Sequence, residues 1–400
     1  MTSNAINTTE TANHFDRWQT IAVAIFMALV GYTVMVSVPV LTTALVQQVG
    51  FSPEQAGRIW GADMLGLSIG ALIAAFTVAR VNRRYLVFIG AGLTIAANAL
   101  CMTFIDYEAI YALRVIAGIG SGLITAVAVA TLGGATNPVM AFNLELVGFS
   151  FSSAFELRFL PTLTMDGIYF FFMSLSVACV LLVFWIPTRP LNAEELALQE
   201  NKQQKDENWH VPKIIPLICL TAICFTYINI GGYFTYIELA ALADGISQDW
   251  TGLVLAWGSF LAIAGCVLAV LCQRYGLFRP LFVSLIVMAA TAIMPSTGIT
   301  DYSLLISVFV FMALWTFVDV YQASMIAHMD RTGSMVALLP CVQGFGQFVG
   351  PNIAASIIGA GLGYGVMFVV SGSMALVALG LYFGVFLYMH RRNSMLAEAT

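Results

Sequence analysis

The sequence predicts an all-α membrane protein with twelve transmembrane helices, arranged as two pseudo-symmetric bundles of six. Three observations predict this fold: the composition, the length of the apolar runs and one long polar segment near the middle of the chain. The 400 residues are 60% hydrophobic and 9% charged, whereas soluble globular chains are about 45–50% apolar and about 25% charged. Because so few charges could not cover the surface of a soluble protein, we expect a chain that lies in a lipid bilayer.

The apolar runs are long enough to cross a membrane, because about 20 helical residues span about 30 Å of hydrocarbon. We expect six spans in the first half, at residues 20–46, 57–79, 85–104, 108–132, 138–160 and 166–187. We expect six more in the second half, at residues 212–237, 249–273, 279–297, 302–327, 335–360 and 364–389. The first run is too long for the core of a signal peptide, so we expect it to be retained as the first span.

One long polar connection, residues 188–211, divides these spans into two sets of six. Residues 193–201 within it are suited to a short surface helix. An even split of this kind is typical of secondary transporters built from two repeats. The expected organisation is a cytoplasmic tail at 1–19, a first bundle at 20–187, a central cytoplasmic loop at 188–211, a second bundle at 212–389 and a cytoplasmic tail at 390–400.

The positions of lysine and arginine predict the orientation, since cytoplasmic loops carry an excess of both. If the N-terminus is cytoplasmic, 13 of the 16 basic residues fall on the cytoplasmic side, namely Arg17, Arg80, Arg83, Arg84, Arg189, Lys202, Lys205, Lys213, Arg274, Arg279, Arg331, Arg391 and Arg392. The other side keeps Arg58 and Arg158, and Arg114 lies within a span. We expect an integral protein of a bacterial-type inner membrane, with both termini cytoplasmic.

Several other classes of protein are excluded by the sequence. No Gly-Lys dipeptide is present, so there is no P-loop for an ATP-driven pump, and no basic tail that would bind nucleic acid. The seven cysteines form no CxxC pair, and the four histidines form no cluster with metal-ligand spacing. We therefore expect no cofactor, no metal site and no nucleic-acid partner. No nucleophile–base pair is visible, which argues against an enzyme.

Two loops resemble a signature of the major facilitator superfamily, whose pattern is roughly D-R-x-G-R-R. The loop after the second span supplies Arg80, Arg83 and Arg84, but has Ala79 and Asn82 at the acidic and glycine positions. The equivalent loop of the second half has basic residues at Arg274 and Arg279. The resemblance implies that these arginines take part in the conformational change of a transporter.

Glycines within the spans extend this resemblance. The fourth span, from Arg114 to Gly122, is similar to the family pattern R-x-x-x-G-x-G-x-G. Small residues let helices approach closely, so we expect helix-packing roles for Gly66, Gly70, Gly118, Gly120, Gly122, Gly346 and Gly350. Residues 233–238 resemble the sugar-efflux and drug-efflux-like branch, whereas the fifth span lacks the Gly-Pro signature of drug–proton antiporters.

Charged side chains within the spans are functional candidates, because each costs about 2.5–3.5 kcal/mol at the bilayer centre on insertion scales. At 1.5 Å per residue, four lie about 9–12 Å from the expected span ends; these are Asp63, Arg114, Glu145 and Asp319. Three more lie within about 6 Å of an end, where a side chain can reach the headgroups instead; these are Glu156, Arg158 and Glu238.

Arg114 needs an anionic partner or a wet cavity, since a guanidinium group stays charged. Asp63 and Glu156 lie at a similar depth, and either is a candidate partner. A carboxylate that alternates between an arginine and a proton would couple proton flow to a conformational cycle. We therefore regard Asp63, Glu145, Glu156 and Asp319 as proton-coupling candidates, with a fixed ion pair that only clamps helices together as the alternative.

In this superfamily, spans one, four, seven and ten line a central cavity. The resemblance therefore implies a solute site that contains Tyr32, Arg114, Asn229, Tyr233, Tyr236, Trp315 and Asp319. Tyr233 and Tyr236 are equally compatible with the aromatic belt at the membrane surface. Trp315 lies midway along its span, so a belt position is less suitable for it.

Taken together, these patterns predict a secondary active transporter that moves a small organic solute by alternating access. We expect proton coupling, a lipid bilayer as its surroundings, and a monomer. Uptake symport is slightly favoured by the missing motif in the fifth span. The alternative is proton-coupled efflux of drugs, sugars or other metabolites. A more remote alternative is a solute receptor without transport, although neither the tails nor the central loop can hold the extra domain that such a receptor usually carries.

Overall fold

The computed structural model describes residues 14–78, 80–135, 138–188, 212, 214–329, 335 and 338–392. Within these ranges, every regular element is helical. The long helices of the first half are α1 (Trp18–Ala44), α2 (Pro53–Thr77), α3 (Arg83–Cys101), α4 (Tyr107–Leu132), α5 (Pro138–Phe159) and α6 (Met165–Leu182). Those of the second half are α8 (Ile214–Ala243), α9 (Gln248–Cys272), α10 (Phe278–Ile293), α11 (Asp301–Met329), α12 (Leu339–Gly359) and α13 (Gly363–Arg392).

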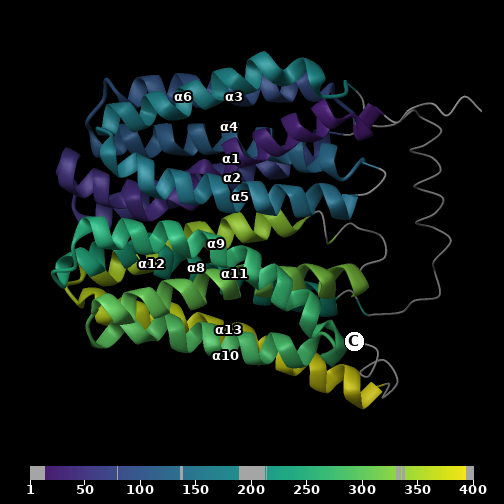
Figure 1. Cartoon of the computed structure of the whole chain (residues 1–400), viewed down its shortest axis with the longest axis vertical. Coiled ribbons are helices and arrows are strands. Elements are labelled where there is room, and N and C mark those ends of the chain that lie inside the picture. Colours follow the sequence, from purple (N-terminus) through teal and green to yellow (C-terminus); the bar gives the residue numbers. More distant parts are fainter. Residues whose placement is uncertain are drawn as a thin grey trace, which may run out of the picture.

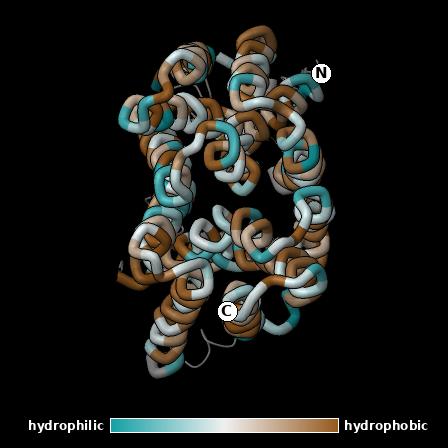
Figure 2. Tube along the Cα trace, turned by 90° about the vertical axis from the view of Figure 1, so that its left-hand side faces the viewer, coloured by the Kyte–Doolittle hydropathy of each residue, from teal (hydrophilic) through white to brown (hydrophobic). Residues whose placement is uncertain are grey.

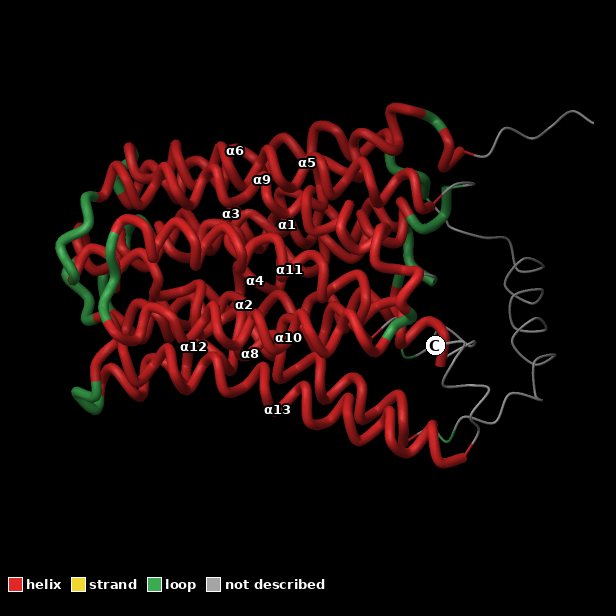
Figure 3. Tube along the Cα trace, turned by 60° about the horizontal axis from the view of Figure 1, so that its bottom comes forward, coloured by secondary structure: helices red, strands yellow, loops and turns green. Residues whose placement is uncertain are grey.

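Each long helix coincides with one span expected from the sequence, and local signals set several of its starts. Ser52 caps α2 in a capping box with Gln55, and Asp106 and Ser247 cap α4 and α9 through their side-chain oxygens. These caps satisfy backbone N–H groups that have no partner within the helix. The loops that the structure describes between these helices are short and lie at the two ends of the molecule (Figure 3).

Ten of these long helices are apolar and long enough to cross a membrane. The other two, α5 and α12, carry polar side chains such as Glu145, Glu156 and Gln347. Both pack against the opposite half of the chain, α5 against α9 and α12 against α2. A polar side chain on a helix that faces protein is shielded from lipid, so these two helices tolerate a lower hydropathy.

The helices lie side by side along one common direction, with α1–α6 in one group and α8–α13 in the other (Figure 1). Helix α1 begins and α13 ends at the same end of the bundle, which we name the terminal end; the other is the opposite end. Figure 2 views the molecule from the opposite end and shows the two groups facing each other. Phe170, Leu181 and Val283 are more than half exposed on the outside, as expected of side chains that contact lipid.

The helix pairs that join the two groups are related by the internal pseudo-symmetry. Helix α2 packs on α12, and its counterpart α9 packs on α5, while α1 also contacts α8. Within each group, α2 packs on α4, and correspondingly α9 packs on α11. The same contacts thus recur in both halves of the chain.

Glycines allow the closest of these contacts, between α2 and α4. A Cβ atom on Gly118 would overlap the backbone carbonyl of Asp63, and one on Gly66 would overlap that of Val115. Gly70 and Gly122 lie in the same contact, while Gly120 faces α3. In the second half, Gly346 and Gly350 lie against the backbone of α8 in the same way. The two helices of each pair therefore approach backbone to backbone.

Replacing Gly118 by alanine should force α2 and α4 apart, because the added methyl group has no free space. Overpacking of this kind costs about 1–3 kcal/mol, so the thermal unfolding midpoint of the purified protein in detergent should fall. Gly92→Ala on α3 is the matched control, since a Cβ atom there meets nothing within 4 Å. Equal midpoints for the two variants would contradict the close approach of α2 and α4.

Candidate functional site

The most buried charges of the described chain form an ion pair between α4 and α2. Arg114 Nε lies 3.2 Å from Asp63 Oδ2, and both side chains are 1% exposed. The rings of Trp60 and Tyr169 lie on the same guanidinium group, with 5.6 Å from each ring centre to Cζ. Asp63 is thus the ion-pair partner of Arg114. The sequence alone had left Asp63 and Glu156 as two candidates for this role.

Arg114 is enclosed by the first helix group, so it does not face the space between the two halves. Its neighbours Asp63, Trp60 and Tyr169 come from α2 and α6, which belong to that group. A buried charge pair is stable only when both charges remain together. The described structure therefore places Arg114 away from the remaining residues that the resemblance assigned to a solute site.

A second set of polar and aromatic side chains lies where the two halves meet. We name it the central cluster: Tyr32 on α1, Glu145 on α5, Tyr227 on α8, and Trp315 and Asp319 on α11. Tyr227 Oη donates a hydrogen bond of 2.7 Å to Asp319 Oδ1, and the ring of Tyr32 stands edge-on to that of Phe149 at 6.2 Å. Tyr32 lies within electrostatic range of both Glu145 and Asp319.

The central cluster carries two carboxyl groups without a basic partner among the described residues. The ion pairs of the described chain are Arg58–Glu54 and Arg114–Asp63, so neither Glu145 nor Asp319 takes part in one. Both side chains, like that of Tyr32, are only partly buried. Part of each of these residues is therefore exposed in the described structure.

Three other residues expected in the solute site are packed inside the second helix group or at its edge. Asn229 Nδ2 donates to the carbonyl of Ser371 on α13 at 2.8 Å. Tyr233 Oη lies 2.7 Å from Ser307 Oγ on α11, and Tyr236 Oη donates to the carbonyl of Pro53 at 3.0 Å. Tyr233 is 1% and Tyr236 0% exposed, which favours a position inside the protein over the aromatic belt, the other interpretation that the sequence left open.

Two carboxyl groups that lie near expected span ends are also buried, so they do not reach the lipid headgroups as side chains at a span end can. Glu156 is 2% exposed and accepts hydrogen bonds from Ser37 and Ser152, each at 2.7 Å. Glu238 is 1% exposed, and α8 continues beyond it to Ala243 rather than ending near residue 237. Arg158 is exposed, as its position near the end of α5 suggests.

The loop arginines of the first half hold that half together. Arg83 donates to Thr131 Oγ1 on α4 at 3.1 Å and lies over the ring of Phe15. Arg84 donates to the carbonyls of Phe184 and Ile186, which follow α6, at 2.6 and 2.8 Å. Arg80 is exposed. In the second half, Arg274 and Arg279 are exposed, and Arg274 lies over the ring of Tyr275.

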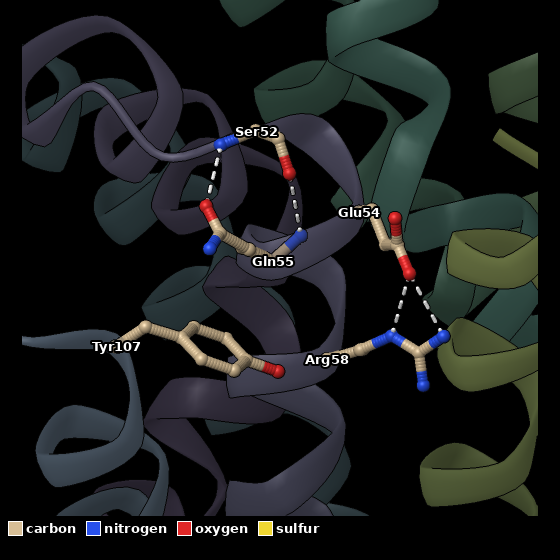
Figure 4. Close-up of a pocket in the computed structure, with 5 residues that line it drawn as sticks. All are labelled: Ser52, Glu54, Gln55, Arg58 and Tyr107. Carbon is tan, nitrogen blue, oxygen red and sulfur yellow. Dashed lines mark hydrogen bonds and ion pairs between the residues drawn. The ribbon is translucent and has the colours of Figure 1, made fainter. Parts of the chain in front are cut away.

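A surface hollow at the opposite end is lined by Ser52, Glu54, Gln55, Arg58 and Tyr107 (Figure 4). Four of its five side chains already have partners. Arg58 pairs with Glu54 at 2.9 Å and donates to Ser356 Oγ on α12 at 3.1 Å, while the side chains of Ser52 and Gln55 each accept from the other residue's backbone N–H. The hollow therefore includes a contact between the two halves, made by Arg58 and Ser356.

The sequence did not single out Tyr227, although this residue is the hydrogen-bond partner of Asp319. A tyrosine in an apolar run is a weak signal, because packing accounts for most of them. Gln322, one turn after Asp319, donates to Thr226 Oγ1 at 2.8 Å. In the part of the chain that the structure describes, no group of three or more His, Cys, Asp or Glu side chains is arranged to hold a metal ion.

Comparison with known proteins identifies a family and a fold. Residues 21–351 match the family model described as Major Facilitator Superfamily. The fold is similar to that of a D-xylose-proton symporter, with a TM-score of 0.71 and 16% identity over 91% of this chain and 97% of that one. It is also similar to the nucleoside transporter NupG (TM-score 0.67, 12% identity, 92% and 98% covered) and to the human organic anion transporter MFSD10 (0.65, 14%, 91% and 99%). A search of curated proteins found no match.

The ion pair should make Asp63 and Arg114 strongly interdependent in stability. Asp63→Asn removes the carboxylate that lies directly beside the buried guanidinium group, which should cost about 3–5 kcal/mol, and Arg114→Gln should cost as much. The double variant should recover most of this loss in a double-mutant cycle of unfolding midpoints. Arg58→Gln at the exposed pair is the control, with an expected loss of about 0–1 kcal/mol. Additive effects at Asp63 and Arg114 would show that the pair does not contribute as described.

Proposed function

Since the chain belongs to the Major Facilitator Superfamily and is thus a membrane transporter rather than an enzyme, we propose that it moves a small organic cation together with protons. The central cluster carries this proposal. Glu145 from one half and Asp319 from the other lie near Tyr32 without a described basic partner. Two carboxyl groups among aromatic rings favour a positively charged solute, through charge-assisted hydrogen bonds and cation–π contacts.

The same arrangement argues against an anionic solute. Arg114 is the charge that would attract a carboxylate, but it is paired with Asp63 and covered by Trp60 and Tyr169. An anion between the halves would instead meet the carboxyl groups of Glu145 and Asp319. We therefore propose a solute with a protonated amine or a similar cationic group, held against Tyr32, Tyr227 and Trp315.

Proton coupling is supported by carboxyl groups that lie apart from the central cluster. Asp63 and Glu156 are both buried within the first helix group, and a carboxyl group can take up a proton where an arginine cannot lose one. Because the proton and the solute would bind to different residues, both could be carried at once, as symport requires. This separation favours uptake symport, which the missing Gly-Pro signature in α5 also favours.

The second candidate is a proton-coupled antiporter that exports drugs, sugars or other metabolites. Its supporting observation is that Glu145 and Asp319 are themselves carboxyl groups between the halves. If a proton and a cationic solute compete for one of them, each turnover exchanges the two. Symport and antiport therefore differ in which carboxyl group takes the proton.

Alternating access is supported by the small number of side-chain bonds between the halves among the described residues. At the opposite end, Arg58 bonds to Ser356 and Tyr236 to Pro53. Further along the bundle, Ser153 Oγ lies 2.8 Å from Ser259 Oγ, and Ser68 bonds to the carbonyl of Cys341 near the start of α12. We propose that the halves rock about these contacts as rigid groups, with arginines such as Arg83 and Arg84 keeping the first group intact. Since both halves of the site lie in one chain, we propose a functional monomer.

For orientation, we propose that the terminal end faces the cytoplasm of a bacterial-type inner membrane. The described basic residues Arg17, Arg80, Arg83, Arg84, Arg274 and Arg279 lie in or beside its loops, and only Arg58 and Arg158 lie near the opposite end. Cytoplasmic loops carry such an excess. The expected central loop at 188–211 lies almost wholly outside the described residues, so its location is part of this proposal.

Transport in reconstituted vesicles tests the solute class and the coupling together. Organic amines, neutral polyols and carboxylates are added outside while a trapped dye reports internal pH. We expect amines alone to change the pH, with acidification inside for symport and alkalinisation for antiport. Glu145→Gln and Asp319→Asn should each raise the half-saturating amine concentration about 10–100-fold, since a hydrogen bond to a charged group contributes about 1.5–3 kcal/mol.

The matched control is Glu54→Gln at the exposed pair, which should leave the half-saturating concentration unchanged. A pH change produced by polyols or carboxylates but not by amines would refute the cationic solute. Amine transport that follows a sodium gradient and ignores the proton gradient would refute proton coupling.

Cysteine labelling tests the orientation. In a variant without the seven native cysteines, Gln203→Cys in the central loop should react with a membrane-impermeant reagent only after the cells are opened. Thr300→Cys, which is exposed at the opposite end, should react in intact cells. The reverse pattern would overturn the proposed topology.

A further inference from the structure

A small, partly open cavity lies inside the first helix group, away from the central cluster. It is lined by Val30, Thr33, Val34, Thr94, Asn98, Arg114, Ser121, Phe172, Leu175 and Ser176. Its water-accessible volume is about 10 Å³, which is close to the space that one water molecule needs. Six of these ten side chains are polar, so the cavity has the size and the polar partners that a single water molecule requires.

Two fully buried side chains on the cavity wall each have an atom there without a hydrogen-bond partner. Asn98 Oδ1 is an acceptor without a donor, and Arg114 Nη1 is a donor without an acceptor. Asn98 and Arg114 are both 0% exposed. Buried polar groups in folded proteins are almost always satisfied by protein or by ordered water. One water molecule can accept from Arg114 and donate to Asn98, which satisfies both groups.

The cavity also leads to a second carboxyl group. Thr33 lies on the cavity wall, and its Oγ1 has two acceptors within reach, the carbonyl of Leu29 at 3.1 Å and Glu156 Oε1 at 3.5 Å. A water molecule in the cavity can donate its second proton to Thr33 Oγ1, whose own proton can rotate from Leu29 to Glu156. On the other side, Arg114 is paired with Asp63. Arg114 thus has a direct anionic partner on α2, and a second carboxyl group, on α5, lies next to the wall of the same cavity.

We propose that this cavity holds one structural water molecule that links Arg114 to Glu156 through Thr33, so that Asp63 and Glu156 share one exchangeable proton. The proposal rests on the proton coupling proposed above and places its proton in this site. Arg114 supplies one fixed positive charge, and the two carboxyl groups supply two negative charges when both are ionised. A single proton makes the site neutral, and it can be held by either carboxyl group.

The other groups that face this site do not change this charge balance. Cys101 on α3 and Tyr169 on α6 are the other titratable side chains near Arg114, and both are neutral at physiological pH. Glu156 is surrounded by hydroxyl groups, those of Thr33, Ser37 and Ser152. No further described charge is paired with these residues, so the shared proton is the balancing charge.

Infrared difference spectroscopy of the purified full-length protein tests the inference without any solute. The C=O band of a protonated carboxyl group reports the proton, and exchange into ¹⁸O-labelled water reports a buried water molecule. We expect the wild type to show one water band and one titrating carboxyl band. Asp63→Asn and Glu156→Gln should each abolish the titrating band, because one remaining carboxylate then balances Arg114. Loss of the band in only one of these variants would overturn the sharing of the proton.

Ser176→Val tests the water itself, because the larger side chain fills the cavity. It should remove the water band and change the proton affinity at least tenfold, which is about one pH unit in the midpoint. Ser174→Val is the matched control: Ser174 lies on the same helix and bonds to its own helix backbone as Ser176 does, but it is exposed. If Ser176→Val does not fold, Thr33→Val removes the hydroxyl link at similar volume and should change the proton affinity equally.

Two further outcomes would overturn the proposal. An unchanged midpoint in both Ser176→Val and Thr33→Val would show that the cavity does not connect Arg114 with Glu156. Displacement of the proton by sodium at constant pH would assign the site to a metal cation instead. If the infrared experiments succeed while vesicle transport fails to depend on protons, the site stands and only the proposed coupling fails.

Discussion

The structure depends on the rule that a charge in a dry interior must have its countercharge beside it. Arg114 cannot lose its proton, so α4 can be buried only where another helix supplies an anion. Asp63 on α2 does so at 3.2 Å. In the same helix contact, Gly66 and Gly118 let α2 and α4 approach backbone to backbone, because neither has a Cβ atom to separate the helices. The ion pair and the glycines therefore belong to one contact between α2 and α4.

Because of this constraint, the charged groups within the membrane lie in two separate sites. Arg114 is paired inside the first helix group, so it does not reach the space between the halves. That space contains the carboxyl groups of Glu145 and Asp319 and the aromatic rings around them. Asp319 also receives a hydrogen bond from Tyr227. The separation gives the proposed transporter a proton site inside the first helix group and a solute site between the two halves. A rocking motion of the halves changes the solute site directly, because that site lies between them. It affects the proton site through α1, α2 and α5, whose residues contribute both to the proton site and to the contact between the halves.

Buried hydroxyl groups solve the same problem on a smaller scale. Thr94, Thr125 and Ser176 each donate to a carbonyl four residues earlier in their own helix, which satisfies the hydroxyl proton without a partner helix. Such groups still have lone pairs with which to accept a hydrogen bond. The first helix group thus contains a polar lining that costs little to bury and remains able to bind water. The amide of Asn98 and the guanidinium group of Arg114 differ, because each retains an atom that its own helix cannot satisfy.

The sequence by itself determined the twelve helices, their approximate limits and the short list of charges within the membrane. Apolar length and charge scarcity are properties of single segments, so they can be read without knowing how the segments meet. Only the tertiary structure decided between Asp63 and Glu156 as the partner of Arg114, because both lie at the same depth and the choice depends on how α2, α4 and α5 are rotated. It also showed that Tyr233 and Tyr236 are buried rather than in an aromatic belt, and brought Tyr227 to Asp319 from a distant part of the chain. Depth in the membrane follows from position along a helix, whereas contact follows from rotation about its axis and from the neighbouring helix, which no single segment specifies.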